Sequence, residues 1–518
     1  MLFNSYPFIF AFLPVTLAGF FWVGRRNGTA AAAWLALASL FFYGWWNPIY
    51  VVLLVGSILF NYAVGVAIVK ADPAMFARRK RLLTAGIGVD LALLAYFKYA
   101  NFFLDNLNTV LGSAISLGTI ILPLGISFFT FTQIAFLVDA YQGKAREYRF
   151  VHYGLFVTYF PHLIAGPILH HGEMMPQFGL PDTYRVNWDK LAAGITMFVI
   201  GLFKKVMLAD GIAVYVIPIF HAARDGIALT FWEGWCGALA YSFQLYFDFS
   251  GYSDMAVGLS LMFGVRLPIN FHSPYKAVNI IEFWRRWHMT LSRFLRDYLY
   301  FPLGGNRRGP ARRYANLMAT MLLGGLWHGA GWTFVLWGGL HGVYLVINHA
   351  WRALRQILGQ DTGRATPWGR AASRLLTFLA VVIAFTVFRA ESFESALAML
   401  RAMAGMNSFA LPDFWFAKWG SLGTWLAAHG AQFTAASGLV TTGLVYWVVI
   451  LLAVVWSAPN SQQILSRFEP ALNIPREPVT WRWLRWNPTH AYAMFVAALA
   501  LVCVINLHQK SEFLYFQF

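Results

Sequence analysis

The sequence predicts an all-α polytopic membrane protein, and three observations support that prediction. Of its 518 residues, 59% are hydrophobic and only 12% are charged, whereas soluble proteins average about 25% charged residues. Apolar runs recur from one end of the chain to the other, with no long polar block between them. The basic residues behind the formal net charge of +17 fall in short clusters between those runs. We therefore expect a single integral membrane domain over residues 1–518.

The positions of the basic clusters predict which ends of the spans face the cytoplasm. Lysine and arginine gather on the cytoplasmic side of multi-pass proteins. The first apolar run, 7–24, has no basic residue before it and is followed directly by Arg25 and Arg26, the reverse of a cleavable signal peptide. Carried along the chain, the rule places both termini outside the cytoplasm. The clusters are expected to contact membrane lipids, and we predict no nucleic-acid partner.

The first part of the chain is expected to hold five spans and one re-entrant segment. Pro161, Gly166 and Pro167 interrupt the apolar stretch 151–169, which favours a re-entrant segment over a span. The expected spans are 7–24, 30–46, one that follows Asn47-Pro48 and ends near Lys70, one that reaches Lys98, and about 115–140.

The remainder of the chain alternates spans with polar connections. Lys204 and Lys205 interrupt the apolar stretch 191–220. Residues 352–374 form a basic connection that we expect inside, whereas the stretch 390–438, rich in Trp, Phe and Gly, is expected outside and partly helical. The further apolar segments are 231–247, 252–265, 439–456, 491–507 and the span 375–388. We predict about 11 spans plus re-entrant and interfacial helices.

The stretch Thr320–Trp337 contains one titratable residue, His328, within a run that has no Asp, Glu, Lys or Arg from Tyr314 to Trp351. A polar group in such a setting costs free energy unless it has a partner or a function. Glycines flank the histidine at 324, 325, 329 and 331, which indicates broken or closely packed backbone. His328 is therefore either a catalytic residue or a helix-packing residue bonded to a neighbouring carbonyl.

Residues Ile280–Leu299 read as one amphipathic helix that lies at the membrane interface. His288 falls on its apolar face and is expected to point into the protein. The alternative is an ordinary surface helix whose arginines bind lipid headgroups. Two i,i+4 ion pairs are expected, Glu282 with Arg286 and Arg293 with Asp297.

Two histidines suit the transfer of an acyl group to a hydroxyl. The hydroxyl must lose its proton as it attacks, and a histidine can accept that proton near neutral pH. We assign this role of general base to His328, and His288 either holds the acyl carbonyl or orients the first ring. The sequence has no G-x-S-x-G elbow, P-loop, Rossmann fingerprint or paired-cysteine zinc spacing. The loose group of His162, His170 and His171 lacks a carboxylate at ligand spacing, so we predict no metal site.

Three runs make the sequence resemble a known family. They are YFDFSGYSDMAVGLSLMFG (246–264), FWRRWHMTLSRFLRDYLYFPLGGNR (283–307) and GGLWHGAGWTFVLWGGLHG (324–342). Together they resemble the membrane-bound O-acyltransferase family, and more narrowly its bacterial alginate O-acetyltransferase-like branch. The teichoic-acid D-alanylation branch is similar through the tryptophan-histidine helix, but LGGNR at 303–307 fits the acetyltransferases better.

The resemblance implies that His328 and His288 are the catalytic residues, in a core of about 115–350 built around a central tunnel. It implies acetyl-coenzyme A as donor, with no metal or prosthetic group, and a site in the bacterial inner membrane. It also implies a periplasmic, SGNH-like acetyltransferase as partner, together with polysaccharide export machinery. The residues expected to bind the donor are Arg285, Arg286, Arg293, Arg307, Trp287 and Trp327, with Arg308 nearby.

Several alternatives stay open at this point. The final acceptor is expected to be an alginate-type exopolysaccharide, with peptidoglycan, cellulose or a teichoic acid as alternatives. The arginines expected to bind the donor could equally bind lipid headgroups. A transporter of a lipid-linked sugar belongs to a different class, and an assembly scaffold with a degenerate site is a third. Asp248, Asp254 and Asp297 are expected to orient helices through arginine or backbone bonds.

Overall fold

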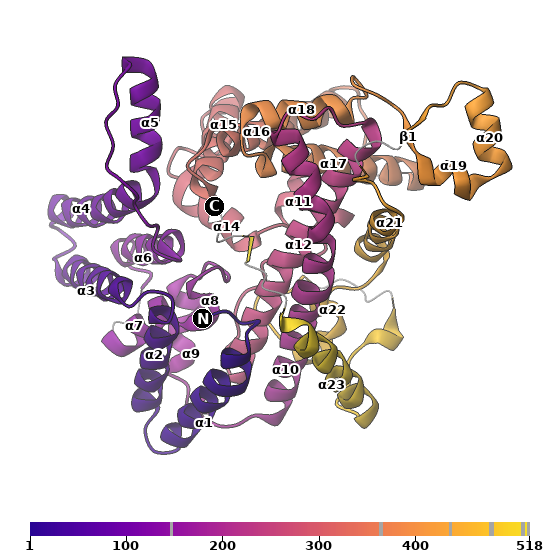
Figure 1. Ribbon diagram of the computed structural model, residues 1–518. Coiled ribbons are helices and arrows are strands. Elements are labelled where there is room, and N and C mark those ends of the chain that lie inside the picture. The colour runs from indigo at the N-terminus through magenta and orange to yellow at the C-terminus, as the bar shows by residue number, and fades with distance from the viewer. Residues whose placement is uncertain (146–148, 362–365, 435–437, 476–480, 509–512, 515–518) are drawn as a thin grey trace.

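The computed structural model describes residues 1–145, 149–361, 366–434, 438–475, 481–508 and 513–514. The described chain is almost entirely helical, as the composition predicts (Figure 1). Its α-helices are α1 Leu13–Gly24, α2 Gly28–Gly44, α3 Ile49–Lys70, α4 Phe76–Leu94, α5 Ala100–Leu111, α6 Ile126–Tyr141, α7 Phe150–Thr158, α8 Phe160–Leu163, α9 His171–Phe178, α10 Trp188–Phe203, α11 Asp210–Arg224, α12 Phe231–Met262, α13 Ile280–Trp284, α14 Met289–Leu295, α15 Gly309–His328, α16 Trp332–Ile357, α17 Pro367–Arg389, α18 Phe393–Met403, α19 Asp413–Trp419, α20 Ser421–Ala428, α21 Thr442–Ser457, α22 Ser461–Ile464 and α23 His490–Ile505.

In the part of the chain that the structure describes, named strands are confined to two short segments. The strands β1 Leu411–Pro412 and β2 Phe433–Thr434 pair in parallel. They lie in the segment with α19 and α20, which projects from the body of the molecule (Figure 1). The prediction that 390–438 is partly helical is confirmed, and its placement outside the cytoplasm stays a prediction.

Four helical segments are long and apolar enough to cross a bilayer: Ile49–Lys70, Phe76–Leu111, Trp188–Arg224 and Pro367–Arg389. Shorter apolar helices are Phe8–Gly24, Gly28–Gly44, Ile126–Tyr141, Thr442–Ser457 and His490–Ile505. The total of about 11 spans stays a prediction.

Helix α12 forms the centre of the molecule, packed against α10 and α11 (Figure 1). The sequence suggested two segments here, 231–247 and 252–265, but the structure has one helix of 32 residues. Gly251 lies inside it because a Cβ there would come within 2.7 Å of the Gly201 carbonyl oxygen on α10. This glycine allows close helix packing and does not break the helix.

Buried ion pairs fix α12 to its neighbours. Lys204 Nζ lies 2.5 Å from Asp254, and Lys205 Nζ lies 2.6 Å from Asp248 and 2.8 Å from Asp210. The carboxylates at 248 and 254 do orient helices, but their partners are lysines where the sequence suggested arginines. Asp248 also accepts a backbone hydrogen bond from Leu514.

Two other expected elements differ from the structure. The expected span 115–140 is helical only from Ile126, because Pro123 precedes a left-handed Gly125 with φ of +72°. The expected interfacial helix 280–299 is interrupted at His288, which has φ of +41° and separates α13 from α14. The apolar side chains keep their helical spacing on both sides of this kink. The hydrophobic pattern therefore gave no sign that the helix breaks at His288.

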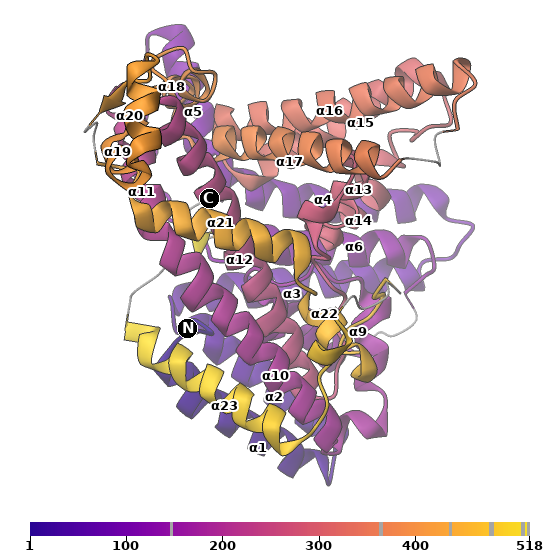
Figure 2. The same cartoon turned by 90° about the vertical axis from the view of Figure 1, so that its right-hand side faces the viewer.

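Helices α15, α16 and α17 run side by side along one edge of the molecule, with α1 and α23 at the opposite edge (Figure 2). The α15–α16 pair is packed through glycines. A Cβ at Gly325 would lie 2.2 Å from the Phe334 carbonyl oxygen, and one at Gly338 would lie 2.3 Å from that of Met321. This confirms the broken and closely packed backbone predicted around His328.

Candidate active site

The two predicted histidines meet in the interior. His328 is the last residue of α15, and His288 occupies the kink between α13 and α14. Their ring centroids are 6.3 Å apart, and each residue is at least nine-tenths buried. The expected proximity of these two residues, which are 40 positions apart in the sequence, is confirmed, and their catalytic roles stay predictions.

Asn270 fixes the orientation of the His288 ring. Its side-chain oxygen lies 3.0 Å from His288 Nδ1 and also accepts hydrogen bonds from the hydroxyl and the backbone N–H of Thr290. Because this oxygen can only accept, Nδ1 of His288 carries the proton and Nε2 presents a lone pair. Among the described residues, no protein group hydrogen-bonds that Nε2.

Lys98 caps the end of α15 that carries His328. Its Nζ donates to the carbonyl oxygens of Trp327 at 2.5 Å and His328 at 3.1 Å, while the Tyr99 hydroxyl donates to that of Leu326 at 2.9 Å. The last carbonyls of a helix lack partners within the helix and carry its negative dipole end, so a cation is favourable there. The sequence pattern identifies Lys98 only as the end of a span, although a lysine in an apolar helix is itself a signal of function.

Aromatic rings enclose His328. Trp337 and Phe388 approach it edge-on, with centroids at 5.1 Å and 5.4 Å. Trp337 also contacts a third buried histidine, His341, at 4.9 Å. Within the described chain neither ring nitrogen of His341 has a hydrogen-bond partner. His341 was not among the predicted site residues, although it lies in the same uncharged run as His328.

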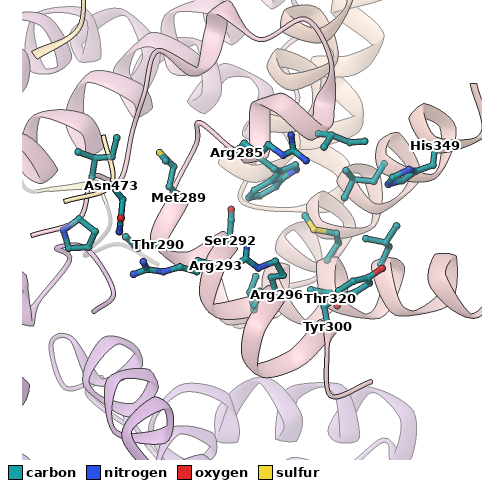
Figure 3. A pocket seen from close by; sticks show the side chains of 18 residues that line it. Arg285, Met289, Thr290, Ser292, Arg293, Arg296, Tyr300, Thr320, His349 and Asn473 are labelled. Atoms are coloured by element: carbon teal, nitrogen blue, oxygen red, sulfur yellow. The ribbon is translucent and has the colours of Figure 1, made fainter. Parts of the chain in front are cut away.

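A cavity of about 680 Å³ is lined by Met289 and Thr290, the two residues that follow His288 (Figure 3), while neither His288 nor His328 is among its lining residues. Thr290, which shares Asn270 with His288, forms part of its wall, as does Thr320 on the helix of His328. Apolar residues line much of the cavity, and its basic residues are Arg285, Arg293, Arg296 and His349. Figure 3 shows these arginines on the segment that carries α13 and α14.

The arginines of this cavity differ in whether a protein carboxylate already pairs with them. Arg293 forms a bidentate pair with Glu173 at 2.5 Å and 2.7 Å, and Arg296 pairs with Asp297 at 2.7 Å. Arg285 is exposed and forms no ion pair with any described residue. The expected ion pair of Arg293 with Asp297 is therefore wrong. Arg293 pairs instead with Glu173, which lies 120 positions earlier in the sequence.

The other residues expected to bind the donor lie elsewhere. Arg286 pairs with Glu282 at 2.8 Å, which confirms that expected ion pair, and does not line the cavity. Arg307 and Arg308 lie in the exposed turn before α15, also outside the lining. The structure places the two predicted tryptophans in the aromatic core. Trp327 stacks on Phe131 at 5.2 Å, and Trp287 stacks on Phe283 at 5.6 Å.

The loose histidine group has protein partners. His162 binds the Phe156 carbonyl oxygen at 2.7 Å, His170 binds the Tyr298 hydroxyl at 3.0 Å, and His171 pairs with Asp139 at 3.1 Å. In the part of the chain that the structure describes, no group of three or more His, Cys, Asp or Glu residues is arranged to hold a metal ion. The two cysteines, Cys236 and Cys503, are free.

The chain belongs to the membrane-bound O-acyltransferase family, whose sequence model matches residues 126–388. The matched part contains both site histidines and most of the cavity. The chain is therefore an acyltransferase of the multi-pass membrane class, as the resemblance implied.

Named relatives refine this assignment. The chain is 46% identical to the peptidoglycan O-acetyltransferase of Helicobacter pylori, over 79% of this chain and 81% of that protein. It is 38% identical to the probable alginate O-acetylase AlgI of Azotobacter vinelandii, over 100% of both chains. It is 28% identical to the teichoic acid D-alanyltransferase of Streptococcus thermophilus, over 51% of this chain and 68% of that one.

Proposed function

We propose that this protein passes acetyl groups from cytosolic acetyl-coenzyme A across the bacterial inner membrane, for O-acetylation of an exported polysaccharide. The observation that carries the proposal is the pair of buried histidines, 6.3 Å apart, beside an arginine-lined cavity. An alginate-type exopolysaccharide is the proposed acceptor, in line with the relative that matches over its full length.

The arginine-lined cavity suits a donor with an anionic end and a long neutral arm. Arg285 is the cation best placed to bind a donor phosphate, because no carboxylate of the described residues neutralises it. The apolar walls, which include Leu317 and Met321, would hold the arm as it runs toward Thr290. The thioester would then be presented near His288, whose neighbours Met289 and Thr290 line this end of the cavity.

The reaction is a transfer of acyl from sulfur to oxygen. His328 accepts the proton of the acceptor hydroxyl as its oxygen attacks the thioester carbonyl. The new C–O bond forms, the C–S bond breaks, and the proton passes to the departing thiolate. His288, whose ring is fixed by Asn270, helps to position the His328 ring 6.3 Å away, because the hydroxyl has a single proton and donates it to His328. With its proton on Nδ1 it is not a donor toward the acyl oxygen, which argues against the carbonyl-holding role considered from the sequence.

The direct acceptor is proposed to be a hydroxyl delivered from the outer side of the membrane. There a periplasmic, SGNH-like acetyltransferase completes the transfer to sugar. The export machinery supplies the polymer. Peptidoglycan O-acetylation is a second candidate, because the relative at 46% identity carries that name. O-acetyl content of the secreted polymer and of purified peptidoglycan, compared between wild-type and deletion cells, separates the two.

The decisive test replaces His328 with alanine. Loss of a general base lowers turnover by about 100-fold to 10,000-fold, measured as transfer of labelled acetyl from acetyl-coenzyme A by purified protein. His490→Ala is the control, since His490 is exposed at the start of α23 and lies outside the cavity. Transfer at the wild-type rate by a folded His328→Ala protein would rule out the mechanism.

A further inference from the structure

A second cavity lies apart from the histidine site. It measures about 550 Å³ and forms where three segments meet: the α1–α2 turn, the start of α7, and the chain that follows α9. Each segment contributes one arginine, namely Arg25, Arg149 and Arg185. Among the described residues that line it, none is an aspartate or a glutamate.

The walls of this cavity are built by close packing. Tyr184 is buried, and its hydroxyl donates to the Phe178 carbonyl oxygen at 2.6 Å. A Cβ at Gly28 would come within 2.7 Å of the Tyr184 ring, so the α1–α2 turn sits directly on this tyrosine. The contact holds Arg25 and Arg185 on one cavity although 160 residues separate them in the sequence.

The charges and the helix terminus at this cavity favour a bound anion. Gly28 and Thr29, the first two residues of the 17-residue helix α2, line it, and helix amino termini favour negative charge. In the part of the chain that the structure describes, neither Arg25 nor Arg185 forms an ion pair. Like charges that share one cavity repel each other unless an anion neutralises them.

The surroundings indicate where the anion comes from. Large apolar side chains are exposed on the same segments, among them Trp22 at 65%, Leu180 at 56% and Trp188 at 75%. Exposed tryptophans beside arginines are typical of the boundary between headgroups and acyl chains. A ligand with a phosphate head and two acyl chains satisfies both the cations and the apolar rim.

We propose that the Arg25–Arg149–Arg185 cavity binds the headgroup of an anionic phospholipid of the phosphatidylglycerol type. The phosphodiester bonds to the arginines and to the first turn of α2, and the acyl chains lie along the exposed apolar side chains. The site is separate from the arginine-lined cavity beside His288, and it does not depend on the acetyl-transfer proposal.

Native mass spectrometry of the purified full chain in a neutral detergent tests this. Dioleoylphosphatidylglycerol is titrated against wild type and the double variant Arg25→Gln, Arg185→Gln. Loss of charge-assisted bonds to phosphate weakens the first lipid bound by about tenfold for each arginine. Arg26→Gln is the matched control, because Arg26 is adjacent but lies over the Trp22 ring and outside the cavity. It is expected to bind as wild type does.

Several results would overturn the proposal. The first is equal phosphatidylglycerol binding by the double variant and wild type. The second is binding of phosphatidylcholine as tight as that of phosphatidylglycerol. The third is displacement of the lipid by inorganic phosphate at matched concentration, which would make this a free-phosphate site. If the double variant does not fold, wild type is labelled with a phosphatidylglycerol that carries a photoreactive headgroup. Adducts at residues 25–29 or 149–152 support the proposal, and adducts confined to other segments refute it.

Discussion

Replacement of Lys98 by methionine tests whether the cap on α15 positions the catalytic pair. Methionine keeps the length and the apolar stem but removes the ammonium that donates to the carbonyl oxygens of Trp327 and His328. Hydrogen bonds to a charged group contribute about 1.5–3 kcal/mol each, so the two together contribute roughly 3–6 kcal/mol. The buried carbonyls are then left without a donor, and the last turn of α15 is expected to shift.

A shift of that turn carries the His328 ring with it. Misplacement of a catalytic group by about 1 Å costs on the order of 100-fold in rate. We therefore expect kcat for acetyl transfer to fall by about that factor, with KM for the donor within about twofold of wild type, because Lys98 does not line the arginine cavity. Tyr99→Phe removes one neutral hydrogen bond, worth about 1 kcal/mol, and is expected to lower kcat by about fivefold.

The assay must separate loss of position from loss of fold. Thermal unfolding and the yield of monodisperse protein are measured beside the kinetics, with Lys70→Met as the control for loss of one exposed lysine. A Lys98→Met protein that is folded and keeps the wild-type kcat would refute the positioning role. A fall in kcat that only follows the fraction of unfolded protein would assign Lys98 to stability alone.

Two further predictions follow from the cavity and from the α15–α16 packing. Arg285→Gln is expected to raise the KM for acetyl-coenzyme A by about tenfold with kcat little changed, since one charge-assisted phosphate contact is lost. Arg286→Gln serves as its control, because that arginine is held by Glu282 outside the cavity; equal effects of both variants would contradict the assigned donor site. Gly325→Ala is expected to destabilise the protein by about 1–3 kcal/mol, because its Cβ would overlap the Phe334 carbonyl oxygen. Thermal unfolding measures this change, Gly88→Ala is the control with open space around its Cβ, and equal stability of both variants would show that the close approach is tolerated.

The sequence was sufficient for those features that depend on local composition. The class of protein followed from the length of the apolar runs, because a bilayer imposes length and polarity on each span. His328 stood out because it is the one histidine in the glycine-rich stretch 320–337 of such a run. Glycine spacing likewise indicated the tight α15–α16 pair, since only a missing side chain permits that approach.

The sequence was insufficient where a side chain chooses between several partners. Arg285 and Arg286 are adjacent and chemically identical, yet one faces a cavity and the other is held by Glu282. Arg293 had a partner at helical spacing in Asp297 but pairs with Glu173 instead. Such choices depend on backbone direction, which the kink at His288 sets for this segment.

The sequence by itself determined that this is a membrane acyltransferase. It also singled out His328, a histidine in an uncharged apolar run, as the first candidate for the site. Only the tertiary structure decided how the site is held. Asn270 orients His288, and Lys98 caps the helix of His328 from 230 residues away. A single sequence does not show that these distant segments are in contact. A hydrogen bond depends on distance in space and is independent of separation along the chain.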